Sequence, residues 1–313
     1  MSGAVGASRP ARSVLAVPAS NRRMVAKALA SAADMVFLDL EDAVPPAETA
    51  AARGDVIWAL RELDWGTKPR CYRVNALDTP FFYRDLIEVV EAAGDRLDLV
   101  LVPKVNRPED VYVVATLLDQ LEAAGGLTHR IGLEVQVETA AGMVACERIA
   151  AASDRVEALV FGPGDYAASL RMPVAAIGTD DEWDAAYEGH RFHYAMARLL
   201  VAGRAAGVRV IDGPLADIRD AAGLRRASTR ARALGFDGKW CIHPAQIDIV
   251  NEVFTPTAAD IAWAQRVADT YGAAVATGRG AVALDGTMLD AASVRMAEAT
   301  LARARAAGVG DAG

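Results

Sequence analysis

The chain has 313 residues, of which 53% are hydrophobic and 24% are charged, and its formal net charge is −8. This length suits one large domain with an appendage, or two modest domains. The apolar fraction is high enough for a sizeable core, which argues against disorder. The mildly acidic balance gives no footprint for nucleic acid or an anionic membrane, and no apolar run approaches transmembrane length. The cysteines are three in number and widely spaced, so we expect no disulfide framework, no thiolate zinc site and a cytoplasmic location.

Short apolar runs alternate with longer helical patterns along most of the chain. Continuous apolar runs are typical of parallel strands that are buried on both faces. The predicted strands are Ser13–Val17, Met35–Leu40, Cys71–Val74, Leu99–Val102, Gly132–Val137, Ala158–Phe161, Val208–Ile211 and Lys239–Ile242. The predicted helices between them include Asn21–Ala32, Pro108–Ala123 and Leu215–Leu234. No GxGxxG follows the first strand, so the sequence favours a closed (β/α)8 TIM barrel over an open dinucleotide-binding sheet.

The chain continues well beyond the eighth predicted strand, further than one closing helix needs. We predict a helix over Thr257–Ala276 with Thr257 as its N-cap, and a second helix over Ala291–Ala307. The stretch TGRGAVALDGTMLDAA between them contains three glycines and predicts a mobile, hairpin-like segment. We therefore predict a catalytic barrel domain over residues 1–255 and a lid or oligomerisation extension over residues 256–313.

Two carboxylates stand out at the end of the barrel that carries active sites, the C-terminal ends of the strands. Glu138 closes the fifth predicted strand and Asp165 follows the sixth, so barrel geometry makes them neighbours. Two carboxylates completed by water or substrate oxygens suit Mg2+, with Mn2+ as a substitute, and neither cysteine nor histidine sits beside them to favour zinc. Separately, Glu138 could be a helix cap or dipole partner and Asp165 a turn residue, but the pair in register favours a metal site.

Acids also crowd the end of the second predicted strand, where Asp39, Glu41 and Asp42 would repel one another unless a cation stands opposite. Arg73 ends the third strand, and a cation in an apolar strand is costly unless it is paired. For Asp39 we expect an ordinary ion pair in a solvated loop, and for Glu41 and Asp42 a role in holding metal-bound waters. The guanidinium of Arg73 suits a carboxylate or a developing enolate oxygen, and a buried salt bridge to Glu41 or Asp42 is a compatible alternative.

Lys104 follows the fourth predicted strand. It could play a part similar to that of Arg73, or it could be a surface lysine whose apolar stem alone is buried. The sequence leaves both readings open.

Several fragments together carry a family resemblance. They are VPASNRRMVAKALASAADMVFLDLEDAVPP, YRVNALDTPF, LVPKV, VETAAGM, GPGDYAASLRM, CIHPAQI and LDGTMLDAA, in this order over most of the chain. With these motifs the chain resembles the CitE-like branch of the HpcH/HpaI aldolase superfamily, and within it the lyases of L-malyl-CoA and β-methylmalyl-CoA. GPGDYAAS in place of GAEDL favours this group over citramalyl-CoA or citryl-CoA lyases.

The resemblance implies a Mg2+ ion bound by Glu138 and Asp165, with Glu41 and Asp42 holding its waters. It also implies that Arg73 contacts a 2-oxo acid, glyoxylate or pyruvate, and the enolate oxygen. The choice between the two acids rests on one methyl group, usually a discrimination of about 1–3 kcal/mol, and the sequence leaves it open.

Three further roles come from the same resemblance. Asp290 would be the acid–base residue, carried on the C-terminal lid and delivered into a neighbouring subunit's site within a homotrimer or homohexamer. Without the resemblance, Asp290 is more simply the N-cap of the helix that follows. Arg23 and Lys27 match positions that look like contacts to the phosphates of CoA.

The implied activity is a reversible, Mg2+-dependent carbon–carbon cleavage of a CoA thioester. Malyl-CoA would give acetyl-CoA and glyoxylate, and β-methylmalyl-CoA would give propionyl-CoA and glyoxylate. A lid makes chemical sense because its closure keeps water from the enolate. Two readings of another class remain: a malyl-CoA thioesterase, in which the metal site directs water onto the thioester, and a non-catalytic subunit of a larger complex.

Overall fold

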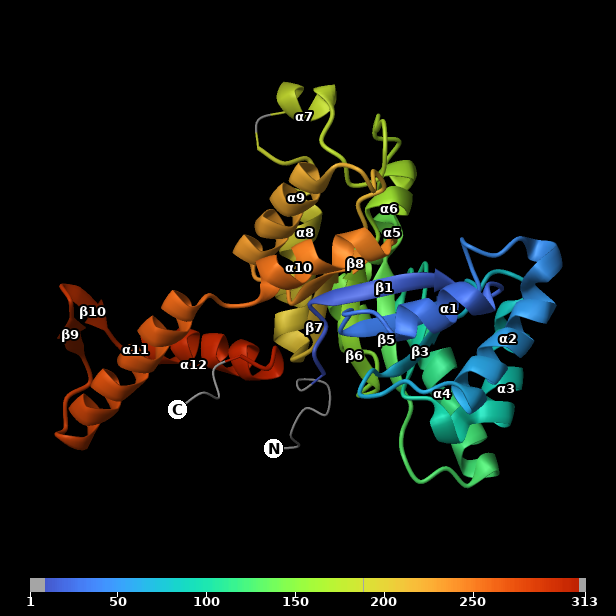
Figure 1. The fold of residues 1–313 in the computed structure, drawn as a ribbon, viewed down its shortest axis with the longest axis horizontal. Coiled ribbons are helices and arrows are strands. Elements are labelled where there is room, and N and C mark those ends of the chain that lie inside the picture. Colours follow the sequence, from blue (N-terminus) through green and yellow to red (C-terminus); the bar gives the residue numbers. More distant parts are fainter. Residues whose placement is uncertain (1–8, 188, 310–313) are drawn as a thin grey trace. The chain divides into compact units, whose positions relative to one another are not determined.

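The computed structural model describes residues 9–187 and 189–309, which form two compact units (Figure 1). The first unit ends at Asn251 and the second begins at Glu252, within helix α10 (Ile247–Phe254) and shortly before the division that we predict after residue 255. Residues 1–8 of the predicted barrel domain and residues 310–313 of the predicted extension lie outside the described residues. In the described part of the chain, no helix has the length and apolar character needed to cross a membrane.

The first unit is a closed barrel of eight parallel strands in chain order, because β1 pairs with both β2 and β8. The strands are β1 (Ser13–Pro18), β2 (Met35–Asp39), β3 (Arg70–Arg73), β4 (Leu99–Val102), β5 (Gly132–Val137), β6 (Val156–Phe161), β7 (Arg209–Asp212) and β8 (Gly238–Cys241). This confirms the predicted barrel, and each strand end lies within two residues of its predicted place.

Burial explains why the strands could be recognised. Every residue of β2, β4, β5, β6, β7 and β8 is buried. Residues from most strands meet in one core cluster that includes Phe37, Leu101 and Trp240, and the rings of Phe37 and Trp240 lie 4.6 Å apart. The barrel is therefore filled by side chains, as closed barrels of this size are.

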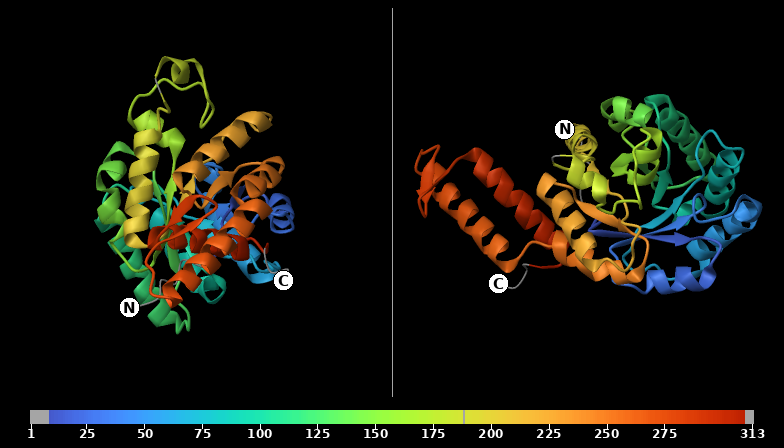
Figure 2. Two further views of the ribbon diagram at one scale, coloured as in Figure 1. Left: turned by 90° about the vertical axis from the view of Figure 1, so that its left-hand side faces the viewer. Right: turned by 90° about the horizontal axis from the view of Figure 1, so that it is seen from above.

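Helices lie outside the strands of this unit (Figure 2). They are α1 (Arg22–Leu29), α2 (Thr49–Glu62), α3 (Phe82–Ala93), α4 (Pro108–Gly125), α5 (Ala140–Ala150), α6 (Pro163–Ser169), α7 (Glu182–Ala186), α8 (His193–Ala206) and α9 (Ala221–Leu234), with short 3-10 helices at Pro46–Glu48, Gly94–Arg96 and Pro244–Gln246. Helix α9 starts six residues later than predicted, because the carboxylate of Asp220 caps it by accepting the N–H of Gly223. Helix α1 ends at Leu29, before the predicted Ala32.

The second unit pairs α11 (Ala258–Ala276) with α12 (Ala291–Ala306), and a hairpin of β9 (Val282–Leu284) and β10 (Thr287–Leu289) connects them. Thr257 caps α11, as predicted, in a reciprocal capping box with Asp260. The predicted hairpin-like segment is confirmed: Asp285 and Gly286 turn it with φ values of 49° and 80°, and tight hairpin turns of this kind need two positive φ values. Its mobility remains a prediction.

Candidate active site

A cavity of about 520 Å³ opens at the C-terminal ends of the barrel strands. Its apolar wall includes Met24, Ile177 and Trp240, and its polar wall is formed by Asp39, Asp42, Arg73, Gln136, Glu138 and Asp165. Sites for small molecules typically measure about 300–1,000 Å³ and combine an apolar lining with a few polar groups. The position and the lining make this cavity the candidate active site.

A buried ion pair between Asp39 and Arg73 forms its floor. The two residues are direct partners in the register of β2 and β3, and two parallel hydrogen bonds of 2.7 Å join the guanidinium to the carboxylate. Asp39 also accepts the N–H groups of Glu41 and Ala43, which shapes the loop after β2. The expected ion pair is present, but the expected solvated loop is wrong for Asp39, whose side chain is only 3% exposed.

Arg73 is also the centre of a wider network. Its Nη1 lies 3.0 Å from Glu41 Oε2, and its Nη2 lies 3.1 Å from Asp42 Oδ2. The predicted alternative is a salt bridge to one of these acids, and the structure has both. Nη1 also donates to Gln136 Oε1 at 3.3 Å. Burial works against the charge, but Asp39, Glu41 and Asp42 raise the pKa of Arg73 above its usual value. The guanidinium is thus a fixed positive charge facing the cavity.

Lys104 also belongs to this network, through its contacts with three of the acids. Its Nζ donates to Glu41 Oε1 at 2.7 Å and lies 3.6 Å from Asp42 and 3.9 Å from Asp165. The ammonium is therefore paired with acids of the site, and its apolar stem is not its only buried part. A part similar to that of Arg73 in contact with a ligand remains a prediction. The backbone of Lys104 has a φ of 51°, a left-handed conformation that costs about 1–2 kcal/mol for a residue with a side chain. This conformation lets its N–H donate to Glu138 Oε1 at 2.9 Å.

Glu138 is almost fully buried at the end of β5. Its Oε2 accepts a hydrogen bond of 2.5 Å from Gln136, and a Cβ on Gly162 would lie 2.4 Å from the same oxygen, so only glycine fits there. Burial and the charge of Glu41 raise the pKa of Glu138 to about 8, with Arg73 opposing and Asp165 adding to the shift. Thr139, and not Glu138, caps α5, which removes the helix-cap alternative.

Asp165 lies in the first turn of α6 and lines the same cavity as Glu138, as predicted. Around them, five carboxylates share two cationic side chains; the acids are Asp39, Glu41, Asp42, Glu138 and Asp165, and the cations are Arg73 and Lys104. A divalent cation would offset the negative charge of Glu41 and Asp165, which adds to the effect of burial in raising the pKa of Glu138. Among the described residues, no three acids, histidines or cysteines converge tightly enough to hold a metal alone. Glu138 and Asp165 supply two carboxylates to one cavity, and this donor set fits Mg2+, which keeps several water or substrate oxygens as ligands.

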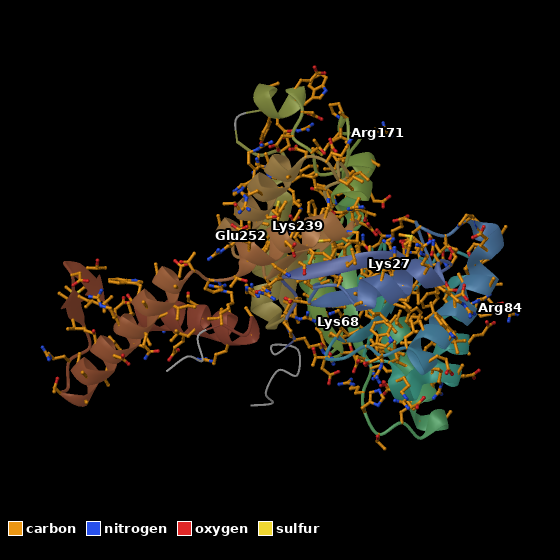
Figure 3. All side chains as sticks on the ribbon, viewed as in Figure 1. Lys27, Lys68, Arg84, Arg171, Lys239 and Glu252 are labelled. Carbon is orange, nitrogen blue, oxygen red and sulfur yellow. The ribbon has the colours of Figure 1, made fainter. Side chains whose placement is uncertain are left out.

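Arg23 and Lys27 lie on α1, both exposed and four residues apart, so they share a helix face (Figure 3 labels Lys27). Met24 of the same helix lines the cavity. The two basic residues therefore belong to an element that borders the cavity.

Asp290 belongs to the second unit, and it is the N-cap of α12. Its carboxylate accepts the N–H groups of Ala292 and Ser293 at 2.9 and 3.0 Å and the hydroxyl of Ser293 at 3.1 Å. Hydrogen bonds from Ser293 lower the pKa of Asp290, which is exposed, so the group is a carboxylate at neutral pH. The simpler reading as an N-cap is confirmed, and it does not exclude a role in acid–base chemistry.

Gln136 is a site residue that the sequence analysis missed. It lies two residues before Glu138 on β5, and strand alternation places both side chains on one face. Its amide joins the guanidinium of Arg73 to the carboxylate of Glu138. The alternation in VQVE was the signal that could have identified it.

Comparisons with known proteins identify the family of the chain. Residues 12–244 match the model of the HpcH/HpaI aldolase/citrate lyase family. The chain is 42% identical over 302 residues, 95% of each chain, to L-malyl-CoA/beta-methylmalyl-CoA lyase of Cereibacter sphaeroides, and 35% identical over 301 residues, again 95% of each, to (3S)-malyl-CoA thioesterase of the same species. The crystal structure of CitE from Mycobacterium tuberculosis with magnesium, acetoacetate and coenzyme A covers 96% of this chain and 99% of its own, with 32% identity and a TM-score of 0.75. The chain therefore belongs to the HpcH/HpaI aldolase/citrate lyase family.

Proposed function

We propose that this protein is a Mg2+-dependent carbon–carbon lyase that reversibly cleaves malyl-CoA into acetyl-CoA and glyoxylate, and β-methylmalyl-CoA into propionyl-CoA and glyoxylate. The observation that carries the proposal is that Arg73, Glu138 and Asp165 line one cavity in a chain 42% identical to a lyase named for these substrates. The CitE structure adds support, since it contains a metal, an oxo acid and CoA together.

Glu138 and Asp165 would hold the Mg2+ ion, or Mn2+ in its place. Bound there, the metal would polarise the carbonyl of the oxo acid as a Lewis acid. Glu41 is held in place by Arg73 and Lys104, whereas the side chain of Asp42 is 55% exposed. Both carboxylates can accept hydrogen bonds from water beside the metal, and we assign them that role.

Arg73 and Asp290 would handle the charge and the proton of the carbon–carbon step. Cleavage leaves an enolate on the acetyl thioester, and Arg73 is already oriented by Asp39, so it can stabilise this oxygen without reorganising. In condensation, the carboxylate of Asp290 would take a proton from the methyl group of acetyl-CoA, and in cleavage it would return one to the enolate carbon. We propose that Asp290 reaches this site from a neighbouring subunit of a homotrimer or homohexamer.

The CoA part of the substrate would lie along α1, where Arg23 and Lys27 offer two positive charges to its phosphates. The three cysteines are free and buried, which is compatible with a reducing cytoplasm.

A thioesterase is the second candidate, because the chain is also 35% identical to a malyl-CoA thioesterase. Incubation with Mg2+, acetyl-CoA and glyoxylate separates the two activities. We expect malyl-CoA to accumulate, as followed by chromatography, and pyruvate in place of glyoxylate to give less product. Free malate with free CoA would identify the thioesterase, and the absence of both products would refute the proposed function.

The affinity for Mn2+ is expected to rise with pH up to about pH 8 and then to level off. Because the pKa of Glu138 is raised to about 8, the cation must displace a proton from this carboxyl below that pH. Each unit of pH below the pKa should then weaken binding by up to about tenfold. Titrations of the metal-free protein with Mn2+, followed by electron paramagnetic resonance, test this, and an affinity independent of pH would contradict it.

A further inference from the structure

The ammonium group of Lys104 lies among carboxylates where a metal ion is expected. Its Nζ is 2.7 Å from Glu41, 3.6 Å from Asp42 and 3.9 Å from Asp165. Asp165 is one of the two proposed metal ligands. The other ligand, Glu138, is bound by the backbone N–H of the same lysine. Lys104 is therefore close to both proposed metal ligands, to Asp165 through its ammonium and to Glu138 through its backbone N–H.

The backbone of Lys104 lies in the loop after β4 and is held there by hydrogen bonds. Lys104 has a left-handed φ of 51°, and its backbone N–H donates to Glu138. The N–H of the next residue, Val105, donates to the carbonyl of Gln136 on β5. The Lys104 ammonium donates a hydrogen bond to Glu41 and lies close to Asp42 and Asp165, so its positive charge faces three carboxylates.

We propose that the ammonium of Lys104 competes with the divalent cation for the carboxylates of the site. It compensates the negative charge of Glu41, Asp42 and Asp165 when no metal is bound, and its positive charge weakens the binding of the metal. The inference rests on the proposed metal site. It assigns Lys104 a positioning role, since the residue acts through the carboxylates that it contacts.

The competition has a physical basis in charge and reach. Two positive charges a few ångströms apart repel strongly where water is partly excluded, so a metal beside Asp165 must work against the ammonium. The four-carbon stem lets the ammonium withdraw toward Glu41, which already accepts its shortest hydrogen bond. The metal can therefore bind, but with an affinity below that of the carboxylates alone.

The test compares Mn2+ binding by the full-length wild type with that of Lys104→Met, using electron paramagnetic resonance of free Mn2+. Methionine keeps an unbranched stem and leaves the backbone N–H to Glu138 in place. We expect the variant to bind Mn2+ about tenfold more tightly than the wild type. Lys104→Arg keeps the charge and should stay close to the wild type. Lys68→Met removes the same charge from the turn before β3, at the end of that strand opposite Arg73, and serves as the matched control (Figure 3 labels Lys68).

Melting of the metal-free proteins gives a second readout. Lys104→Met should melt below the wild type without metal, because Asp165 loses its contact with the ammonium and Glu41 and Asp42 keep only their contacts with Arg73. Saturating Mn2+ should raise the melting temperature of the variant by more than that of the wild type. A purely structural role would lower stability and metal affinity together. Equal or weaker Mn2+ binding by folded Lys104→Met would refute the inference and leave the metal site standing. No Mn2+ binding by the wild type would instead refute the metal site, and with it both proposals.

Discussion

Glu138→Gln is expected to bind Mn2+ at least about a hundredfold more weakly than the wild type and to lose almost all condensation activity with acetyl-CoA and glyoxylate. Glutamine has the shape of the protonated carboxyl group, so the fold should survive, but it has no charge to offer a divalent cation. The loss should be large because Glu138 is buried beside the cavity and is one of the two proposed protein ligands of the metal. Calorimetric titration with Mn2+ and a product assay measure the two effects separately.

Glu147→Gln is a suitable control for this variant. Glu147 lies on α5, the helix that follows Glu138, and its carboxylate pairs on the surface with Arg198. Its loss removes the same charge from the same segment without touching the cavity. Unchanged Mn2+ binding in Glu138→Gln would show that the metal is not held by this residue, whatever happens to the activity.

The barrel could be predicted because its strands are buried on both faces. A run such as LVLV in β4 has no solvated face, so it appears in the sequence as an uninterrupted apolar segment. The ends of strands are less visible, because hydrogen bonding continues past the apolar residues. Arg70 and Gly238 are each paired in the sheet although neither extends an apolar run. The start of α9 depended in the same way on a cap at Asp220 that propensity alone did not reveal.

The site could be predicted as a set of residues but not as a set of contacts. Glu138 and Asp165 lie where strand order places them. The burial of Asp39 depends on register, since β2 and β3 align so that Arg73 stands directly opposite, and nothing local in DLED encodes this alignment. Lys104 was equally hard to place, because its orientation follows from a single left-handed φ. Contacts that depend on register or on one unusual dihedral angle require the folded chain.

For Asp290, the local sequence and structure predict a helix cap and give no sign of the proposed catalytic role. Its carboxylate acts as an N-cap, with hydrogen bonds from Ala292 and Ser293 to one of its oxygens. Local structure therefore gives no sign of catalysis, and the role in acid–base chemistry rests on the family to which the chain belongs. Only a variant that keeps the cap and changes the chemistry can separate these two roles.

Asp290→Asn is such a variant, and it is expected to abolish condensation of acetyl-CoA with glyoxylate while leaving Mn2+ affinity nearly unchanged. Asparagine caps helices about as well as aspartate, so α12 and the stability of the protein should be preserved. What is lost is the basic carboxylate, whose pKa the hydrogen bonds from Ser293 keep below its usual value. Asp285→Asn, in the turn of the neighbouring hairpin, removes the same charge from the same unit and should remain active. A parallel loss of metal binding, or normal condensation, would contradict the role of Asp290.

Mixed oligomers test whether Asp290 acts in its own subunit or in the next one. Glu138→Gln chains retain Asp290, and Asp290→Asn chains retain the metal ligand, so neither forms a working site by itself. If the acid comes from a neighbouring subunit, equal co-expression should restore about a quarter of the wild-type activity, because one site in four then pairs an intact metal ligand with an intact Asp290. If Asp290 serves its own barrel, every site in the mixture lacks one of the two groups and no activity returns. Because the two parents are inactive for different reasons, recovered activity can come only from sites shared between chains.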